Sequence, residues 1–381
     1  MLVIKNVDVY SPEHLGVRDI LICNEKIEFI SENIPDIPVD CEILDGTDLI
    51  LTPGFIDNHV HIAGGGGEGS FHTRTPEIQL SELIKAGITT VVGLLGTDTM
   101  TRSIENLYAK TRALSEEGMT SYMLTGGYSH PGPTITGSAD KDITFIREVL
   151  GLKLAISDHR APNISLDEFK KIASATRVAG MLSDKPGIVV LHMGDATTGL
   201  DMVFDSVEET AIPIRIFRPT HVNRNPDLLE QSYEFLARGG YIDLTCGISD
   251  SREPGYCIVE AMNRNLPLDH ITISSDGHGS WSNYADDGTL LEIGVSGVDT
   301  LLKEVHRLVI ELNIPLENAI TYLTSNVAKS LNIYPNKGSI QVGSDADILI
   351  MSKNLDLDTV IAKGRVMMHG GNLRQKGTYE Q

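Results

Sequence analysis

The sequence has few cysteines, and none of them is arranged as a metal or redox motif. Its 381 residues include Cys23, Cys41, Cys246 and Cys257, which form no Cys-x-x-Cys pair and show no regular spacing. This pattern argues against a disulfide scaffold and against a zinc site built from cysteines. A reducing compartment, the cytoplasm, fits it best.

Basic residues and long apolar runs are also scarce. The chain has 31 Lys and Arg against 52 Asp and Glu, a formal net charge of −21, which disfavours non-specific binding to nucleic acid or to anionic membranes. No run reaches the length of a membrane span, and the start, MLVIKNVDVYSPEH, lacks the basic and cleavage regions of a signal peptide. An acidic protein that binds an acidic ligand needs local positive charge, so arginines near a candidate site are informative.

Both ends of the chain are rich in short β-type runs. Polar or glycine turns separate the runs 2–10, 19–31, 42–54, 339–343, 346–351, 359–364 and 365–370. We expect one small, β-sandwich-like domain built from both termini, comprising residues 1–52 and 335–381.

The middle of the chain alternates between apolar, β-branched runs and helix-like segments. Eight such runs recur, at 55–62, 89–95, 121–126, 152–157, 187–193, 217–222, 241–246 and 270–275. The segments 76–87, 103–118 and 165–180 between them have helical patterns. This alternation predicts an α/β fold with a closed (β/α)₈ TIM-type barrel over residues 53–334, in which catalytic groups lie at the carboxyl ends of the strands.

Polar side chains occur at those strand ends. His59 and His61 lie two apart in the first run and therefore on one face of the strand, while His192, His221 and Asp276 close the fifth, sixth and eighth runs. A lone His-x-His pair is as often a pair of hydrogen-bonded core residues. Four histidines and a carboxylate converging on one barrel mouth instead form a ligand set suited to zinc or another divalent metal.

Lys153 lies within the fourth run, where an ammonium facing the barrel interior is costly without a partner. One resolution is a neutral amine that reacts with carbon dioxide to give a carbamate able to bridge two metals. The other is a lysine that reaches solvent or pairs with a carboxylate. The spacing alone leaves both open.

Longer motifs point to a family. The strings GFIDNHVHIAGGGGEG, TRTPE, VVGLLGTD, MLTGGY, AISDHR, HMGD, PTHVNRN and SSDGHGS span nearly the whole chain. With Lys153 in the fourth run, the chain resembles the isoaspartyl (β-aspartyl) dipeptidases of the metal-dependent amidohydrolase superfamily.

The resemblance implies a two-metal hydrolase with divalent cations, Zn²⁺ in the first instance, and N6-carboxylation of Lys153. The metal ligands it implies are His59, His61, Lys153, His192, His221 and Asp276. A metal-bridging hydroxide would attack the β-aspartyl isopeptide bond, with Asp276 as general base and then general acid. Tyr128 would donate to the developing oxyanion.

The resemblance also implies how an acidic dipeptide, with two carboxylates and one ammonium, is bound. Arginine forks match carboxylates, so Arg160 and Arg224 suit this substrate. The implied substrate contacts are Glu68, for the ammonium, with Gly66, Thr97, Arg160, Arg224 and Ser280. The glycine run at 64–67 lacks the endings of a phosphate loop, which disfavours nucleotide binding. Members of the family form homo-oligomers.

Two other functions remain open at this point. Another amidohydrolase, such as a cyclic-amide hydrolase or an N-acyl amino acid deacylase, would share every metal ligand, and a non-catalytic scaffold could retain the barrel without the chemistry. Glu68, Arg160, Arg224 and Tyr128 favour a doubly acidic dipeptide over cyclic amides, which lack paired terminal charges. His278 and the loop 246–255 depart from the family pattern, which leaves the range of accepted dipeptides open.

Overall fold

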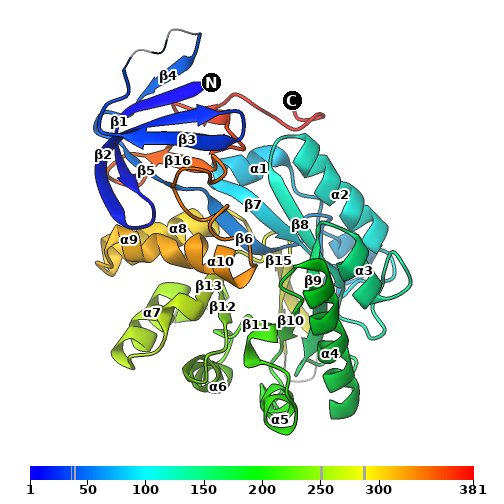
Figure 1. The fold of residues 1–381 in the computed structure, drawn as a ribbon. Coiled ribbons are helices and arrows are strands. Elements are labelled where there is room, and N and C mark those ends of the chain that lie inside the picture. The colour runs from blue at the N-terminus through cyan, green and yellow to red at the C-terminus, as the bar shows by residue number, and fades with distance from the viewer. Residues whose placement is uncertain (36, 38–39, 249–251, 286–288) are drawn as a thin grey trace.

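The chain folds into a parallel barrel and a mixed sheet built from its two ends, in a computed structural model that describes residues 1–35, 37, 40–248, 252–285 and 289–381. Figure 1 shows the mixed sheet as a separate layer beside the barrel, with both termini on that side of the molecule. A two-stranded hairpin, β14 (Ser280–Tyr284) and β15 (Leu290–Val295), forms a third, small sheet.

The barrel contains all eight expected strands. They are β6 (Phe55–Val60), β7 (Ile88–Gly93), β8 (Thr120–Gly126), β9 (Val149–Ile156), β10 (Ile188–Met193), β11 (Phe217–Thr220), β12 (Ile242–Thr245) and β13 (Ile271–Ser274). Each pairs in parallel with the next along the chain. A parallel bridge between Val60 and Gly277 joins the first strand to the segment after the last. The expected (β/α)₈ barrel is confirmed.

Helices cover the outside of this barrel (Figure 1). They are α1 (Leu80–Lys85), α2 (Ile104–Glu116), α3 (Ala139–Phe145), α4 (Leu166–Ser183), α5 (Asp201–Glu209), α6 (Pro226–Ala237), α7 (Pro254–Asn263), α8 (Thr300–His306), α9 (Leu316–Ala319) and α10 (Ser325–Ser330). In α4, Ser165 and Glu168 form a capping box at the start, and Phe169, Ala173 and Thr176 are buried at helical spacing. That apolar stripe packs against the strands.

One end of the barrel interior is closed by apolar packing. Ile56, Leu124 and Val190 from the strands form one buried cluster with Val327 and Leu331, which lie in and just after α10. The polar residues expected at strand ends lie toward the opposite end. The candidate site is therefore confined to one mouth of the barrel.

The second sheet is built from both termini, as expected. Its strands are β1 (Leu2–Tyr10), β2 (His14–Cys23), β3 (Lys26–Ser31), β4 (Glu42–Asp45), β5 (Ile50–Pro53), β16 (Ile348–Met351), β17 (Leu357–Ala362), β18 (Arg365–His369) and β19 (Asn372–Leu373). Their order is β19-β18-β17-β16-β5-β1-β2-β3, with β4 also on β1. The boundaries at 52/53 and 334/335 stay predictions.

One expected strand of this sheet does not form. Residues 339–343 have no strand conformation, because Ser11 bonds both the N–H and the carbonyl of Ile340 and Gly343 turns with a φ of 90°. The backbone N–H and carbonyl of Ile340 thus form their hydrogen bonds with a side chain instead of with a neighbouring strand.

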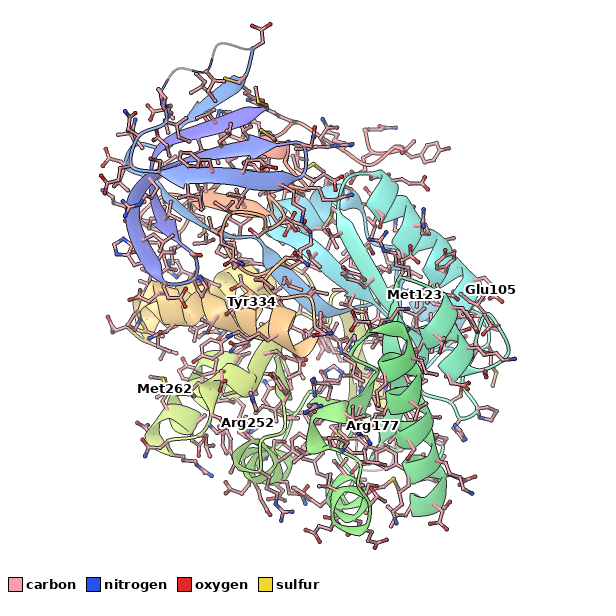
Figure 2. The ribbon with its side chains drawn as sticks, viewed as in Figure 1. Glu105, Met123, Arg177, Arg252, Met262 and Tyr334 are labelled. Carbon is pink, nitrogen blue, oxygen red and sulfur yellow. The ribbon has the colours of Figure 1, made fainter. Side chains whose placement is uncertain are left out.

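Lys337 joins the sheet to the barrel. Its buried ammonium donates to Asp347 and, at 2.6 Å, to Thr120 of β8, and lies 2.9 Å from Asp345. Figure 2 draws the side chains on the ribbon of Figure 1, with Tyr334 labelled near this junction and Met123 labelled on β8. Within the described ranges, no helix is long and apolar enough to span a bilayer.

Candidate metal and substrate site

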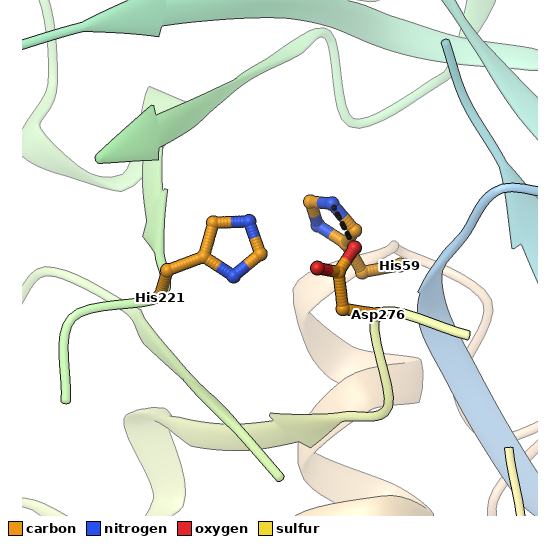
Figure 3. Close-up of side chains that lie close together, drawn as sticks. All are labelled: His59, His221 and Asp276. Atoms are coloured by element: carbon orange, nitrogen blue, oxygen red, sulfur yellow. Dashed lines mark ion pairs between the residues drawn. The ribbon is translucent and has the colours of Figure 1, made fainter. Parts of the chain in front are cut away.

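His59, His61 and Asp276 meet at the mouth of the barrel. The Nε2 atoms of His59 and His61 lie 3.5 and 3.2 Å from Oδ1 of Asp276. One ligand atom each from His59, His221 and Asp276 can be chosen so that all lie within 4.8 Å of one another. Figure 3 shows the two rings and the carboxylate facing a common space.

His221 and Asp276 both have left-handed backbone conformations, with φ of 61° and 52°. The chain turns sharply after each strand, where Arg224 N–H bonds the His221 carbonyl at 3.1 Å and Gly279 N–H bonds that of Asp276 at 2.9 Å. Non-glycine residues adopt this conformation at a cost of about 1 kcal/mol or more, and such strain clusters at functional sites.

The His221 turn is held from two sides. Nδ1 of His221 lies 2.9 Å from the hydroxyl of Thr245. Arg252, labelled in Figure 2, donates to the carbonyls of Asn223 and Arg224 at 3.0 and 2.8 Å. These contacts orient the ring so that Nε2 is available to a ligand.

His192 is bonded at both ring nitrogens. Its Nδ1 contacts the Tyr128 hydroxyl, and its Nε2 lies 3.0 Å from Oδ2 of Asp158. Its ring packs edge-on to that of His221, with 4.8 Å between the centroids. His192 is therefore part of the cluster, with Tyr128 at one ring nitrogen and the carboxylate of Asp158 at the other.

Lys153 projects into the same space. The residue is 1% exposed, and its Nζ lies 3.1 Å from Nε2 of His59. Burial lowers the pKa of its ammonium to about 7, although Asp276 and Asp243 oppose the shift. The lysine does not reach solvent, and within the described part of the chain it contacts no carboxylate directly. The alternative of a paired or snorkelling ammonium therefore does not describe it.

Burial also sets the charge of the other groups. It lowers the pKa of His59, His192 and His221 well below the usual value, with Lys153 adding to the shift, so these rings are neutral. Burial alone would raise the pKa of Asp276, but His221, His61 and Lys153 outweigh it and lower that pKa. Neutral imidazoles beside an ionised carboxylate present lone pairs inward.

These residues fit divalent cations. By hydrogen-bond geometry Oδ1 of Asp276 has no partner among the described residues, although Nε2 of His61 lies 3.2 Å and Nε2 of His59 3.5 Å from it. Two ring nitrogens and a carboxylate oxygen buried this close together without a hydrogen bond are satisfied by a cation between them. Nitrogen and oxygen donors in this number suit zinc or a similar ion.

A cavity of about 670 Å³ opens above this cluster. It is lined by all the expected site residues except the deeper His59 and Lys153, namely His61, Gly66, Glu68, Thr97, Tyr128, Arg160, His192, His221, Arg224, Asp276 and Ser280. One mouth thus brings the whole expected set together. Their roles as ligands and substrate contacts stay predictions.

The two arginines are already oriented by carboxylates. Arg160 makes a two-point bond to Asp158 at 2.9 Å and approaches Glu68 at 3.4 Å. Arg224 pairs with Asp195 at 3.0 Å. Ser280 donates to Glu68 at 2.9 Å. Each guanidinium has five N–H donors, so some of them remain for a ligand.

The glycine run shapes one wall. A Cβ on Gly64 would lie 2.4 Å from the Thr75 carbonyl, and both Gly64 and Gly66 have positive φ, 77° and 74°. The buried Arg102 fixes this loop by donating to the carbonyls of Ala63, Gly65 and Thr75. Nothing in the sequence indicated this role for Arg102, because its local pattern contains no motif that predicts a buried arginine.

Two further buried residues support the mouth. Asp57 accepts from the backbone and hydroxyl of Ser275, next to Asp276, and burial raises its pKa to about 7. His278, whose role was left open, lies 2.9 Å from the Pro76 carbonyl and 3.0 Å from Glu82 on α1. Of the loop 246–255, residues 249–251 lie outside the described part.

Comparisons with known proteins identify the family and agree with the fold. The sequence profile of the amidohydrolase family matches residues 50–367. Two crystal structures of the β-aspartyl dipeptidase of Fervidobacterium islandicum AW-1, one in complex with β-Asp-Leu, superpose with TM-scores of 0.94 and 0.90 at 41% identity; each covers 98% of this chain, which covers 97% and 98% of theirs. The L-hydantoinase of Paenarthrobacter aurescens is 24% identical over 94% of this chain and 87% of its own length.

Proposed function

The chain belongs to the amidohydrolase family and is a hydrolytic dipeptidase, and from this premise we propose that it cleaves the β-aspartyl bond of isoaspartyl dipeptides. The observation that carries the proposal is the charge arrangement of one cavity. Arg160 and Arg224 face it together with Glu68, above the histidine and Asp276 cluster. Asp158 and Asp195 also line the cavity and pair with these arginines. Each arginine keeps N–H donors for a substrate carboxylate, and Glu68 can accept from one ammonium.

The metal-holding residues proposed are His59, His61 and Asp276 for one divalent ion and His192 and His221 for the other, with Lys153 between them. When bound, such ions supply an activated water at neutral pH and stabilise charge on the carbonyl oxygen. Zinc is the ion proposed, because the donors are mostly imidazole nitrogens.

N6-carboxylation of Lys153 fits its surroundings. A pKa of about 7 leaves much of the amine unprotonated at neutral pH, which is the form that attacks carbon dioxide. The product is an anion that the neighbouring imidazoles, neutral by burial, would not repel. Uncarboxylated, the lysine places a donor 3.1 Å from the His59 nitrogen expected to hold a metal.

Asp276 and Tyr128 are the proposed catalytic residues. Asp276 is ionised and faces the cavity, so it accepts the proton released as water attacks and returns it to the leaving amine. The pKa of the Tyr128 hydroxyl is raised by burial, so it stays protonated and donates to the carbonyl oxygen. Its present acceptor, His192, shows that the hydroxyl points into the site.

The experiment is hydrolysis of β-Asp-Leu compared with α-Asp-Leu by the zinc-reconstituted protein, followed by release of free leucine. The β isomer should be cleaved at least about 100-fold faster, because only its backbone places both carboxylates and the scissile bond in register with the two arginines. Asp276→Asn is the matched inactive control. Cleavage of the α isomer alone, or of neither, contradicts the assignment.

Cyclic amides are the second candidate class, because the L-hydantoinase relative spans nearly the whole chain. Hydantoin and dihydroorotate belong in the same assay. Turnover of either in preference to β-Asp-Leu would replace the proposed substrate while leaving the metal site in place. A scaffold would bind no metal and show no activity that a chelator removes.

A further inference from the structure

Asp158 lies between the expected metal ligand His192 and the expected substrate contact Arg160. Its side chain is 1% exposed. Oδ2 is 3.0 Å from Nε2 of His192 and 2.9 Å from Nη2 of Arg160. Oδ1 accepts from Nε of Arg160 at 2.9 Å and from the backbone N–H of Arg160 at 2.7 Å. One carboxylate therefore holds two functional side chains.

The carboxylate decides which nitrogen of His192 carries the proton. An ionised carboxylate only accepts hydrogen bonds, so the neutral ring must place its N–H at Nε2, facing Asp158. Nδ1 then presents a lone pair on the cavity side, where the Tyr128 hydroxyl donates to it. A carboxylate behind a ligating histidine fixes its tautomer and strengthens it as a donor.

A second carboxylate in the same mouth offers a contrast. Asp195 pairs with Arg224 at 3.0 Å through both of its oxygens, as Asp158 does with Arg160. Its side chain is 63% exposed, and its other hydrogen bond comes from the side chain of Asn225. Among the described residues, none of the expected metal ligands makes a hydrogen bond or ion pair to Asp195. The two carboxylates thus share the arginine contact and differ in the contact to a metal ligand.

We propose that Asp158 is a positioning residue that couples the metal centre to substrate binding, by fixing the Nε2–H tautomer of His192 and the orientation of the Arg160 fork at the same time. The kinetic part of this inference rests on the proposed function, and the tautomer and metal-affinity parts do not. Asp195 positions Arg224 alone.

Asp158→Asn reverses the hydrogen bond to His192 and also removes the acceptor for one N–H of the Arg160 fork. Oδ1 of Asp158 faces two donors of Arg160, one of them a fixed backbone N–H, so the oxygen of asparagine stays there and its amide turns to His192. The amide donates to Nε2 and drives the proton to Nδ1, which removes the lone pair from the cavity side. Asp195→Asn is the matched control, since it changes an arginine partner without touching a ring.

The first measurement is ¹⁵N NMR of histidine-labelled, metal-free protein, with the His192 signals assigned by their absence in His192→Gln. Wild type and Asp195→Asn should show the Nε2–H tautomer, and Asp158→Asn the Nδ1–H tautomer. The second is zinc affinity against a competing chelator, where Asp158→Asn should lose roughly 10- to 100-fold and Asp195→Asn less than about twofold. With β-Asp-Leu, Asp158→Asn should lower kcat and raise KM, and Asp195→Asn should raise KM alone.

An Nδ1–H tautomer in wild type, or wild-type zinc affinity in Asp158→Asn, would overturn the proposal. If Asp158→Asn does not fold, the wild-type spectrum still decides the tautomer, and Arg160→Met tests the coupling: it should raise KM while zinc affinity is kept. If wild type fails to cleave β-Asp-Leu while the tautomer and affinity results hold, the proposed substrate is wrong and the role of Asp158 at His192 stands.

Discussion

Two lysines are buried in the described part of the chain, and their surroundings differ in kind. Lys153 at the barrel mouth is 1% exposed and Lys337 at the junction with the terminal sheet is 4% exposed. Lys337 contacts Asp345, Asp347 and Thr120, and these carboxylates raise its pKa despite burial. Lys153 contacts one imidazole, and burial lowers its pKa to about 7.

The difference separates a charge that the folded chain matches from one that fits the proposed functional role of Lys153. At the junction the ammonium is matched by carboxylates, so the folded chain alone satisfies it. At the mouth no carboxylate among the described residues pairs directly with Lys153, and Oδ1 of Asp276 is buried without a hydrogen bond. Such a region is completed by what binds to it, which is what a metal and substrate site requires.

The strongest test of this contrast is Lys153→Ala. Residues that merely support a ligand cost 10- to 100-fold when changed, so removing the proposed bridging group should lower kcat/KM by more than about 100-fold and reduce bound zinc. A short carboxylic acid such as propionate should restore part of the activity by replacing the carbamate. Full activity in the variant would refute the bridge.

Lys337→Met should lower the free energy of unfolding and leave activity unchanged. Removing one partner of a buried ion pair leaves Asp347 uncompensated and costs about 3–5 kcal/mol, measured by urea unfolding. The protein that remains folded should keep its kcat and its zinc. Adding Asp347→Asn should recover part of the loss, and a variant as stable as wild type would show that the junction charges are not coupled.

The pH dependence of stability should also distinguish the two lysines. Between about pH 7 and pH 9.5 the unfolded metal-free chain holds a proton on Lys153 that the folded chain has released, so the free energy of unfolding should rise with pH by about 2–3 kcal/mol. Lys153→Met should remove this slope. Lys337 has a raised pKa, so its contribution is complete below the unfolded value of about 10.5 and should be flat over this window. A slope that persists in Lys153→Met would assign it to another group.

The smallest effect is expected at an exposed charge. Arg264 pairs with Glu230 at 2.8 Å and Glu260 at 2.6 Å, with its side chain 37% exposed. Arg264→Gln should change the free energy of unfolding by less than about 1 kcal/mol and leave activity unchanged, because water competes for exposed pairs. A larger loss would mean that the contrast between buried and exposed charges is overstated.

The sequence by itself predicted the eight barrel strands, the terminal sheet and the family. It could do so because strand runs are local patterns, and because a parallel barrel brings the carboxyl ends of all its strands to one mouth. The positions of His192 and Asp276 at this mouth were therefore predicted without knowledge of their neighbours, and their roles as ligands stay predictions. The run 339–343 was misjudged, since the hydroxyl of Ser11, distant in sequence, takes its backbone bonds.

Only the tertiary structure decided what each polar group faces. Three contacts between segments far apart in the chain could not be read from the sequence. They are the contact of Lys153 with His59, the contact of Asp158 with Nε2 of His192, and the hydrogen bonds by which Arg102 holds the glycine loop. Charge state follows from burial and from those contacts, and neither is encoded in a local pattern.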